Sequence, residues 1–382
     1  MTSQIHADGQ TADSGALELL RDSVRRYLGD TPRLPANLWA QRADRHWPAI
    51  CELGLPGMLI PESFGGSGGG LDELAVVQEA WGHGLVRLPL VSTAVVGAWL
   101  LAQLGTPSQR QRWLPAVASG KCRVALAELE SGAGCDPEAV ALRAQHVPGG
   151  FRLNGRKRHV VDGDVAELFL VSARLEGATE GLSLFCVEAG AAGLRQTALP
   201  TLDGAAVAML EFESVALQAD GLLGEPGASA SWLDAARDRG LVALCWEAVG
   251  AMQALLMQTI AYLQQRQQFG QSLASFQALR HQVADMALDI TAARAAARMA
   301  QQALATATGR IPGAQRDVGA AKVFVGEAGR RVAERAVQLH GGMGMTDELA
   351  VGHHFKRLHA IDLTWGDAAF HLQRYAGTML SK

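Results

Sequence analysis

The segment Gln338–Asp367, QLHGGMGMTDELAVGHHFKRLHAIDLTWGD, says more about the fold than any other part of this 382-residue chain. It contains the glycine pair Gly341-Gly342, then a run of helix-forming residues, and then a short stretch around Gly366. Glycine often follows the last turn of a helix, because it adopts the left-handed backbone conformation without a steric penalty. The segment therefore predicts a helix end, a glycine turn, a second helix and a short loop.

Two long stretches before and within this segment predict further helices. Their apolar residues recur at spacings of three and four, and Pro312-Gly313 lies between them. Such spacing puts the apolar side chains on one helix face, as in helices that pack into a bundle. The apolar positions are Leu279, Val283, Met286, Ile290, Ala293, Ala297, Ala300 and Leu304 in the first stretch, and Val318, Ala321, Val325, Ala328, Val332, Ala336 and Leu339 in the second.

The chain before the bundle contains two regions with different sequence patterns. Residues 17–28, LELLRDSVRRYL, place their apolar side chains on one helical face, as expected of a helical region. Further along, short apolar runs such as ELFLVSARL and LSLFCVEAG are separated by Gly, Asp and Pro, which is typical of strands joined by turns. We therefore expect an α+β multidomain fold: an N-terminal all-α domain (1–120), a middle β-barrel or β-sandwich domain (121–228) and a C-terminal four-helix bundle (229–382).

The composition argues against several classes of protein. A formal net charge of −4 gives no electrostatic case for binding nucleic acid or an anionic membrane. The five cysteines are scattered and form no CxxC pair, which favours reduced thiols in the cytoplasm over a disulfide framework or a zinc site. His353, His354 and His359 have no nearby pair of acidic residues with which to bind a metal, so we expect none.

No targeting or membrane segment is expected. The first residues, MTSQIHADGQTADSG, contain neither basic residues nor an apolar run, unlike a signal or transit peptide. The apolar stretch Leu88–Leu104 is short and is interrupted by Pro89 and Gly97, so it predicts a buried helix rather than a membrane span.

Four segments, in order and spread over nearly the whole chain, resemble the acyl-CoA dehydrogenase family. Each is weak alone, and their co-occurrence is specific. The last of them is the opening segment. The others are GLPGMLIPESFGGSGGG (54–70), AELESGAGCDPEAVALRA with GGFRLNGRKRHVVDGDVAELFLVSAR (127–174), and RQQFGQSLASFQALRHQVADM (266–286).

The resemblance implies α,β-dehydrogenation of an acyl-CoA thioester with FAD. A base takes the α-proton, the flavin accepts a hydride from Cβ, and hydrogen bonds to the thioester carbonyl stabilise the enolate. It also implies an electron-transfer flavoprotein or similar acceptor, and either a homotetramer or an α2β2 heterotetramer with a paralogous subunit. The pieces VGHHFKRLHAID and WGDAAFHL resemble the small or partner subunits that act on pimeloyl-CoA-like dicarboxylyl-CoA or steroid side-chain CoA thioesters.

Five residues match family positions that contact the ADP part of a flavin held mainly by the neighbouring subunit. They are Arg266, Phe269, Gln338, Gly341 and Gly342. A guanidinium suits a pyrophosphate, and glycine allows close approach of the backbone. Without the resemblance, Arg266 would be interpreted as a solvated charge at a helix end and the glycines as a helix cap.

The positions expected near the flavin ring depart from the family pattern. Leu129 stands where a Thr or Ser is usual, and His159-Val160-Val161 stands where Trp-x-Thr is usual. Leu129 and Val161 cannot make the hydrogen bonds of those hydroxyls, whereas His159 could stack on a ring or contact a phosphate, or simply lie on the surface. The residues expected at the flavin ring are thus altered, whereas those expected at the ADP part match the family. This is the pattern that one subunit of a hetero-oligomer would show.

The usual base is absent at both positions where the family places it. Trp365 occupies the common glutamate position, and Gly240 occupies the second known position, on the first helix of the bundle. Asp367 is the candidate base, or else the N-cap of the following helix. Asp362 is a further nearby acid, and Glu247 is interpreted as a helix-surface charge.

Three functions fit these residues. The first is an acyl-CoA dehydrogenase with Asp367 as its base. The second is a non-catalytic or half-site subunit that completes FAD binding for a paralogous partner. The third is an acyl-CoA lyase or desulfinase-like activity on the same fold, which needs no α-proton base.

Overall fold

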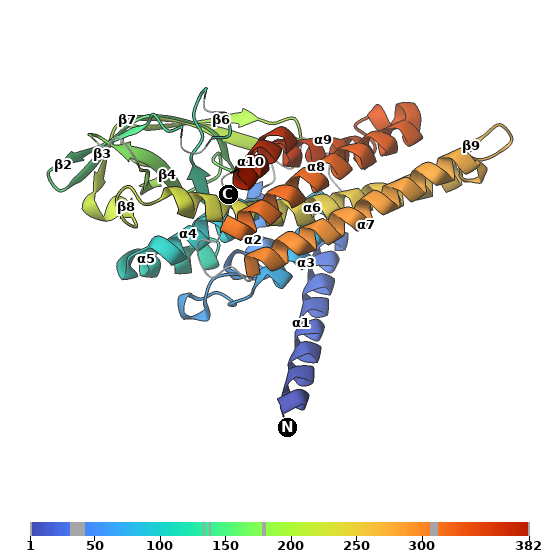
Figure 1. The fold of residues 1–382 in the computed structure, drawn as a ribbon, viewed down its shortest axis with the longest axis horizontal. Coiled ribbons are helices and arrows are strands. Elements are labelled where there is room, and N and C mark those ends of the chain that lie inside the picture. The colour runs from blue at the N-terminus through green and yellow to red at the C-terminus, as the bar shows by residue number, and fades with distance from the viewer. Residues whose placement is uncertain are drawn as a thin grey trace.

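The computed structural model describes residues 2–30, 43–132, 134–136, 139–177, 181–305 and 312–380. A helical N-terminal region is followed by a sheet and then by long helices, in the predicted order (Figure 1). The N-terminal elements are α1 (Thr2–Asp30), α2 (Ala43–Glu52), η3 (Leu55–Gly57), η4 (Glu62–Phe64), α3 (Leu71–Gly84), the π-helix η5 (Val91–Gly97), α4 (Ala98–Leu104) and α5 (Pro107–Ala118).

A capping box begins α5 and ties it to the sheet. The hydroxyl of Thr106 accepts a hydrogen bond from the backbone N–H of Gln109 at 3.2 Å, and the Gln109 side chain accepts one from the backbone N–H of Thr106 at 2.8 Å. The amide nitrogen of Gln109 also donates to the carbonyls of Asp220 and Leu222 in the middle region. One buried glutamine thus both starts a helix and anchors it.

The middle region is a mixed sheet with the order β6-β7-β3-β2-β4-β5-β8, and β1 pairs in parallel with β4. The β3–β7 ladder shifts register between Lys157 and Val160, and this irregularity leaves His159 in the left-handed conformation, with φ of 50°. The strands are β1 (Val124–Ala127), β2 (Arg143–Val147), β3 (Gly150–Val161), β4 (Leu168–Leu175), β5 (Ser183–Glu188), β6 (Leu194–Pro200), β7 (Ala206–Gln218) and β8 (Leu222–Leu223), with the turn η6 (Ala219–Gly221) before β8.

The C-terminal region packs long helices around α6. Among the described residues, only α6 is long and apolar enough to cross a membrane, and 89% of its apolar window is buried inside the protein. The elements are α6 (Ala230–Gln265), the hairpin β9 (Gln267–Gln268) and β10 (Gln271–Ser272), η7 (Leu273–Ser275), α7 (Gln277–Ala305), α8 (Pro312–His340), η8 (Gly341–Met345), α9 (Ala350–Leu363) and α10 (Ala368–Leu380).

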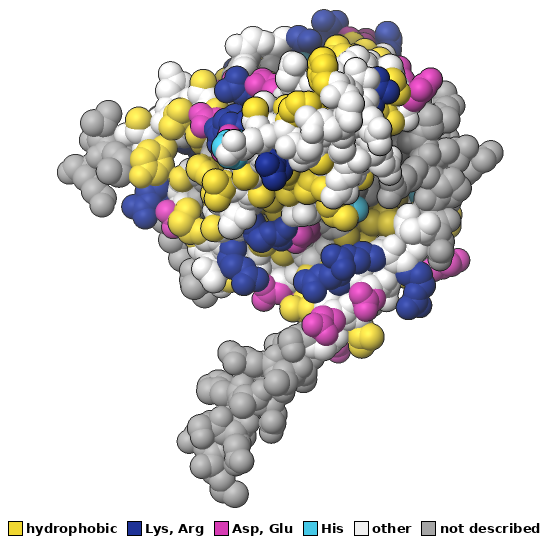
Figure 2. All heavy atoms as spheres, turned by 90° about the vertical axis from the view of Figure 1, so that its right-hand side faces the viewer, with side chains coloured by type: hydrophobic (Ala, Val, Ile, Leu, Met, Phe, Trp, Pro, Cys, Tyr) yellow, Lys and Arg dark blue, Asp and Glu magenta, His cyan; other side chains and the backbone are white. Residues whose placement is uncertain are grey.

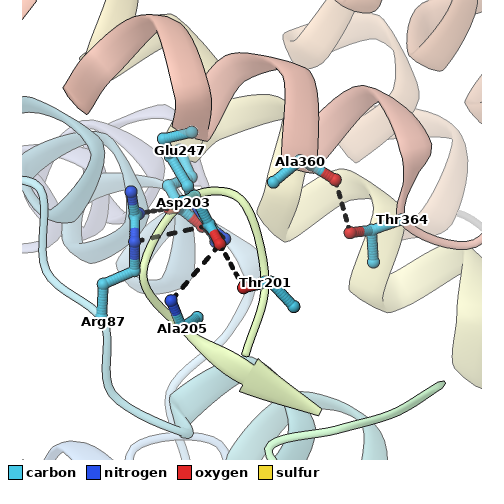
Figure 3. Close-up of polar contacts among 8 residues, drawn as sticks. Arg87, Thr201, Asp203, Ala205, Glu247, Ala360 and Thr364 are labelled. Atoms are coloured by element: carbon cyan, nitrogen blue, oxygen red, sulfur yellow. Dashed lines mark hydrogen bonds and ion pairs between the residues drawn. The ribbon is translucent and has the colours of Figure 1, made fainter. Parts of the chain in front are cut away.

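Four buried charges join the three regions. Arg357 of α9 binds both carboxylate oxygens of Glu247 on α6 and donates to Asp203, in the loop between β6 and β7, at 2.9 Å. Arg87, from the segment before η5, lies 3.5 Å from Asp203 and 3.6 Å from Glu247. Figure 3 shows Arg87, Asp203 and Glu247 converging from these separate elements. We call these four residues the charge cluster.

The charge cluster corrects one sequence-based interpretation. Glu247 was expected to be a helix-surface charge, but it is only 3% exposed. The expectation was wrong because α6 is covered on nearly all sides, and because its partner Arg357 lies 110 residues further along the chain. A buried carboxylate is tolerated here because a bidentate guanidinium neutralises it.

Replacing Arg357 with methionine should destabilise the protein by about 3–5 kcal/mol at neutral pH, because two buried carboxylates lose their main partner.

Burial alone would raise the pKa of Asp203, but Arg357 and Arg87 outweigh it and hold that pKa down to about 2. Asp203 therefore stabilises the fold above about pH 4, and this contribution is lost as the pH falls towards 2. Urea unfolding of the parent protein as the pH falls from neutral towards 2 measures this loss, and urea unfolding of Arg357→Met at neutral pH measures the effect of the substitution.

The matched control is Arg112→Met. Arg112 pairs with Glu188 on the surface, where both side chains are more than half exposed. An exposed pair contributes about 0–1 kcal/mol. Equal losses in the two variants would contradict the role given to the charge cluster.

Candidate active site

The loop between α9 and α10 carries the residue expected to replace the base. At the end of α9, the Thr364 hydroxyl donates to the carbonyl of Ala360 at 2.7 Å, a contact visible in Figure 3. Trp365 then adopts φ of 55°, and Gly366 adopts φ of 108°. The left-handed conformation is rare for a bulky residue. The turn directs the indole of Trp365 inward, where the residue is only 8% exposed.

The indole of Trp365 packs against Gly240 of α6. A Cβ atom at Gly240 would overlap Cζ3 of this indole, and it would lie 2.8 Å from Cη2 and 3.1 Å from Cγ2 of Val96. The two positions expected to hold a base are therefore in contact with each other, and an apolar ring fills the space between them. Neither residue can accept a proton.

The remaining acidic residues of the loop have structural contacts. The carboxylate of Asp367 is exposed and accepts a hydrogen bond from the backbone N–H of Phe370 at 2.8 Å. This is the geometry of an N-cap for α10. Asp362 lies on α9 with its carboxylate 3.9 Å from the ammonium of Lys322. The use of Asp367 as a base stays a prediction.

We call Leu129, His159 and Val161, the positions expected near the flavin ring, the ring-side positions. They lie on two segments that are joined by a backbone hydrogen bond. The carbonyl of Leu129 accepts a hydrogen bond from the backbone N–H of Arg158 at 2.8 Å, which holds the chain after β1 against β3. Leu129 and Val161 are half-buried, and His159 is exposed. The structure thus brings these positions together, but only His159 among the three side chains has a hydrogen-bonding group.

Two buried ionic contacts lie next to Leu129, and no motif in the sequence predicts them. Lys157 is fully buried, and its ammonium donates to Glu130 at 2.7 Å and to the carbonyl of Glu128 at 3.0 Å. Glu128 also pairs with Arg237 at 3.0 Å, with both side chains 2% exposed. This pair joins the residue before Leu129 to α6, about one helical turn before Gly240.

The Glu128–Arg237 pair leaves spare hydrogen-bonding capacity inside the protein. Within the part of the chain that the structure describes, one Glu128 oxygen and Arg237 Nη2 have no hydrogen-bond partner. Asp238 lies next to Arg237, and burial raises its pKa to about 6. A buried ion pair therefore lies between the segment that carries Leu129 and the turn of α6 before Gly240.

The five positions expected at the ADP end lie together at one end of the long helices. Tyr262 of α6 stacks on His340 of α8, with ring centroids 4.5 Å apart, and so holds the two helix ends side by side. Arg266 follows α6 directly, and Phe269 is 88% exposed at the tip of the β9–β10 hairpin. Gln338, Gly341 and Gly342 are exposed at the end of α8.

This end of the molecule is a surface suited to a neighbour. Figure 2 looks onto it and shows hydrophobic side chains lying between Lys and Arg side chains. Gly341, with φ of 59°, ends α8, so it also serves as the helix cap. Gly342 has open space around its Cα, which leaves the backbone accessible.

The two groups of positions are far apart within one chain. Gly240 and the end of α6 at Gln265 are separated by roughly 38 Å of helix, at 1.5 Å per residue. Figure 1 likewise places the β9 hairpin and the sheet at opposite ends of the long helices. Within one chain, the ring-side positions and the ADP-end positions therefore lie towards opposite ends of the long helices (Figure 1).

Comparison with known proteins gives the family. The acyl-CoA dehydrogenase N-terminal domain matches residues 14–121, the middle domain matches 125–215 and the C-terminal domain matches 235–380. The acyl-CoA dehydrogenase FadE27 of Mycobacterium tuberculosis is 32% identical over 340 residues, which cover 87% of this chain and 88% of that protein. The chain belongs to the acyl-CoA dehydrogenase family and has its three-domain fold.

Solved structures agree with this assignment. A variant of the "Tcur3481-Tcur3483 steroid ACAD" matches with a TM-score of 0.85 and 29% identity, covering 96% of this chain and 98% of that one. The ChsE4–ChsE5 complex of Mycobacterium tuberculosis matches with a TM-score of 0.80 and 29% identity, covering 96% of both chains. The acyl-CoA dehydrogenase of Geobacillus kaustophilus matches with a TM-score of 0.88 and 25% identity, covering 95% and 98%.

FAD is the cofactor of this family, and the chain fits its two ends unequally. The exposed Arg266 and the accessible backbone at Gly342 suit a pyrophosphate. The ring-side residues Leu129 and Val161 offer no side-chain hydrogen bond, and Trp365 fills the adjacent space beside Gly240. When bound, the flavin accepts the hydride, and the protein must bind, orient and desolvate the reactants.

Replacing Gly240 with alanine should destabilise the protein by about 1–3 kcal/mol, because the new methyl group overlaps the Trp365 indole. In a Trp365→Leu background the same change should have little effect, since the smaller side chain leaves room. Unfolding of the two single variants and the double variant measures this coupling.

Gly377→Ala is the matched control. Gly377 lies in α10 with open space around its Cα, so alanine there should be neutral or slightly stabilising. The contact would be refuted if Gly240→Ala destabilised both backgrounds equally.

Proposed function

We propose that this chain is the base-lacking subunit of a heteromeric acyl-CoA dehydrogenase, in which a paralogous partner carries the catalytic base. The observation that carries the proposal is the packing of Trp365 against Gly240, which leaves no proton acceptor at either expected position. The reaction of the complex is FAD-dependent α,β-dehydrogenation of an acyl-CoA thioester, with electrons passing to an electron-transfer flavoprotein or a similar acceptor.

The contribution of this chain is to bind the ADP end of its partner's FAD. Arg266 would pair with the pyrophosphate, Phe269 would cover the cofactor, and Gln338 with Gly341 and Gly342 would contact it through polar and backbone groups. All five lie at an exposed end of the helices, where a neighbouring subunit can reach them. Burial of Phe269 in that interface would also remove an aromatic ring from water.

The similar proteins support a heteromer and a bulky substrate. Among the matching structures are a complex of two chains, ChsE4 and ChsE5, and an assembly described as a steroid ACAD. We therefore propose a steroid side-chain or dicarboxylyl CoA thioester as the substrate class, and an α2β2 assembly. The unpaired cysteines favour a cytoplasmic location.

Flavin content tests the proposal. The chain purified alone should retain little FAD, whereas the complex with its paralogous partner should be yellow with near-stoichiometric flavin. In that complex, Arg266→Gln should weaken FAD binding about 10- to 100-fold, the effect of losing a hydrogen bond from a charged group. The visible absorption spectrum of each purified sample measures its flavin content. Titration of FAD into the complex after its flavin has been removed measures the affinity.

Arg112→Gln, which removes a cation from the surface of α5, is the matched control and should not change flavin content. Near-stoichiometric flavin and acyl-CoA oxidation by the chain alone would rule out the half-site subunit.

Asp367→Asn distinguishes the proposal from an enzyme that uses Asp367 as its base. Asparagine caps a helix about as well as aspartate, so α10 should keep its N-cap and the fold should be unchanged. Turnover of the complex should stay within about twofold of the parent. A general base contributes about 10²- to 10⁴-fold, so a loss of that size with flavin retained would assign the base to Asp367.

A further inference from the structure

A buried lysine holds the loop that carries Trp365. Lys322 of α8 is 1% exposed, and its ammonium donates to the carbonyl of Asp362 at 2.6 Å and to the carbonyl of Gly366 at 3.0 Å. The Asp362 carbonyl belongs to the last turn of α9, where carbonyls lack helical partners and favour a positive charge. Lys322 therefore connects the end of α9 to the loop beyond it.

A close approach of two helices makes this contact possible. Gly326 lies one turn after Lys322 on α8, and a Cβ atom there would overlap the carboxylate of Asp362. Glycine at this position lets α9 approach α8 closely enough for the ammonium to reach two backbone carbonyls. Burial lowers the pKa of Lys322, and the nearby Asp362 carboxylate opposes that shift.

A buried histidine holds the same loop from the other side. His371 of α10 is 1% exposed, and its Nε2 lies 3.1 Å from the carbonyl of Trp365. Burial, with smaller contributions from Lys322 and Arg374, lowers the pKa of His371 to about 4. The ring is therefore neutral near pH 7, and because a carbonyl only accepts, Nε2 must carry the proton.

The carbonyl of Trp365 is thus bound from α10, and the carbonyl of Gly366 is bound from α8. With the backbone held in this direction, the side chain of residue 365 points the opposite way, towards Gly240 on α6. A bulky residue keeps a left-handed conformation only where its surroundings enforce it. The two hydrogen bonds supply that enforcement.

We propose that Lys322 and His371 are positioning residues that direct the side chain of residue 365 at Gly240. We call the hydrogen bonds of these two residues to the loop the clamp. Because they go to backbone carbonyls, the clamp does not depend on which side chain stands at 365. The two contacts therefore direct whatever side chain stands at 365 towards α6, and in this chain that side chain is an indole. This inference rests on the loop geometry and holds whether or not the chain is a half-site subunit.

Fluorine NMR of the full chain, labelled with 5-fluorotryptophan and studied in the oligomer in which it purifies, tests the clamp. The Trp365 resonance is identified by its loss in Trp365→Phe. In Lys322→Met this resonance should move towards the shift of free 5-fluorotryptophan and broaden. The resonance of Trp246, which lies on α6 and bonds to Gln301, should not move.

Lys356→Met is the matched control, because Lys356 is a partly exposed lysine of α9 whose ammonium lies 3.4 Å from the side chain of Asp347. It should leave every resonance in place. His371→Leu should move the Trp365 resonance in the same direction as Lys322→Met, and the two changes together should add little.

An unmoved Trp365 resonance in folded Lys322→Met overturns the proposal. If Lys322→Met fails to fold, His371→Leu decides in the same way, since it removes the second contact and leaves the lysine in place. Equal movement of all tryptophan resonances would show general loosening of the fold and would also overturn a specific positioning role.

Discussion

The fold depends on the neutralisation of charge inside it. Arg87, Asp203, Glu247 and Arg357 come from the N-terminal region, the middle sheet and two helices of the bundle, and their side chains meet in one buried place. A bidentate guanidinium–carboxylate contact is directional, so it specifies one arrangement of the two side chains. The charge cluster therefore fixes how the sheet sits against α6, and with it the distance between the ring-side positions and the loop before α10.

The region around Trp365 is one of several places where a bulky residue holds an uncommon backbone conformation. His159, Phe269 and Trp365 all hold the left-handed conformation that is uncommon outside glycine, and all three stand at positions that the sequence associates with the cofactor or the base. Such conformations persist where surrounding contacts enforce them.

Much of the fold followed from the sequence, because helix periodicity and short alternating strands are local signals. The end of α8 at His340 and the glycine that follows it agree with the motif that predicted a helix end and a glycine turn. The buried ionic contacts could not be foreseen. Glu128 and Arg237 are 109 residues apart, and Lys157 lies in a strand whose neighbours look like surface charges. Which charges meet is decided by tertiary packing.

Exposure at the end of the helices has a consequence for how the chain is made. Phe269 is 88% exposed and Met345 is 78% exposed, so a copy without a neighbour presents a ring and a flexible thioether to water. Such a copy is prone to self-association and to capture by quality-control proteases. In the proposed heteromer, the partner subunit covers this surface, so synthesis of the two chains is expected to be matched.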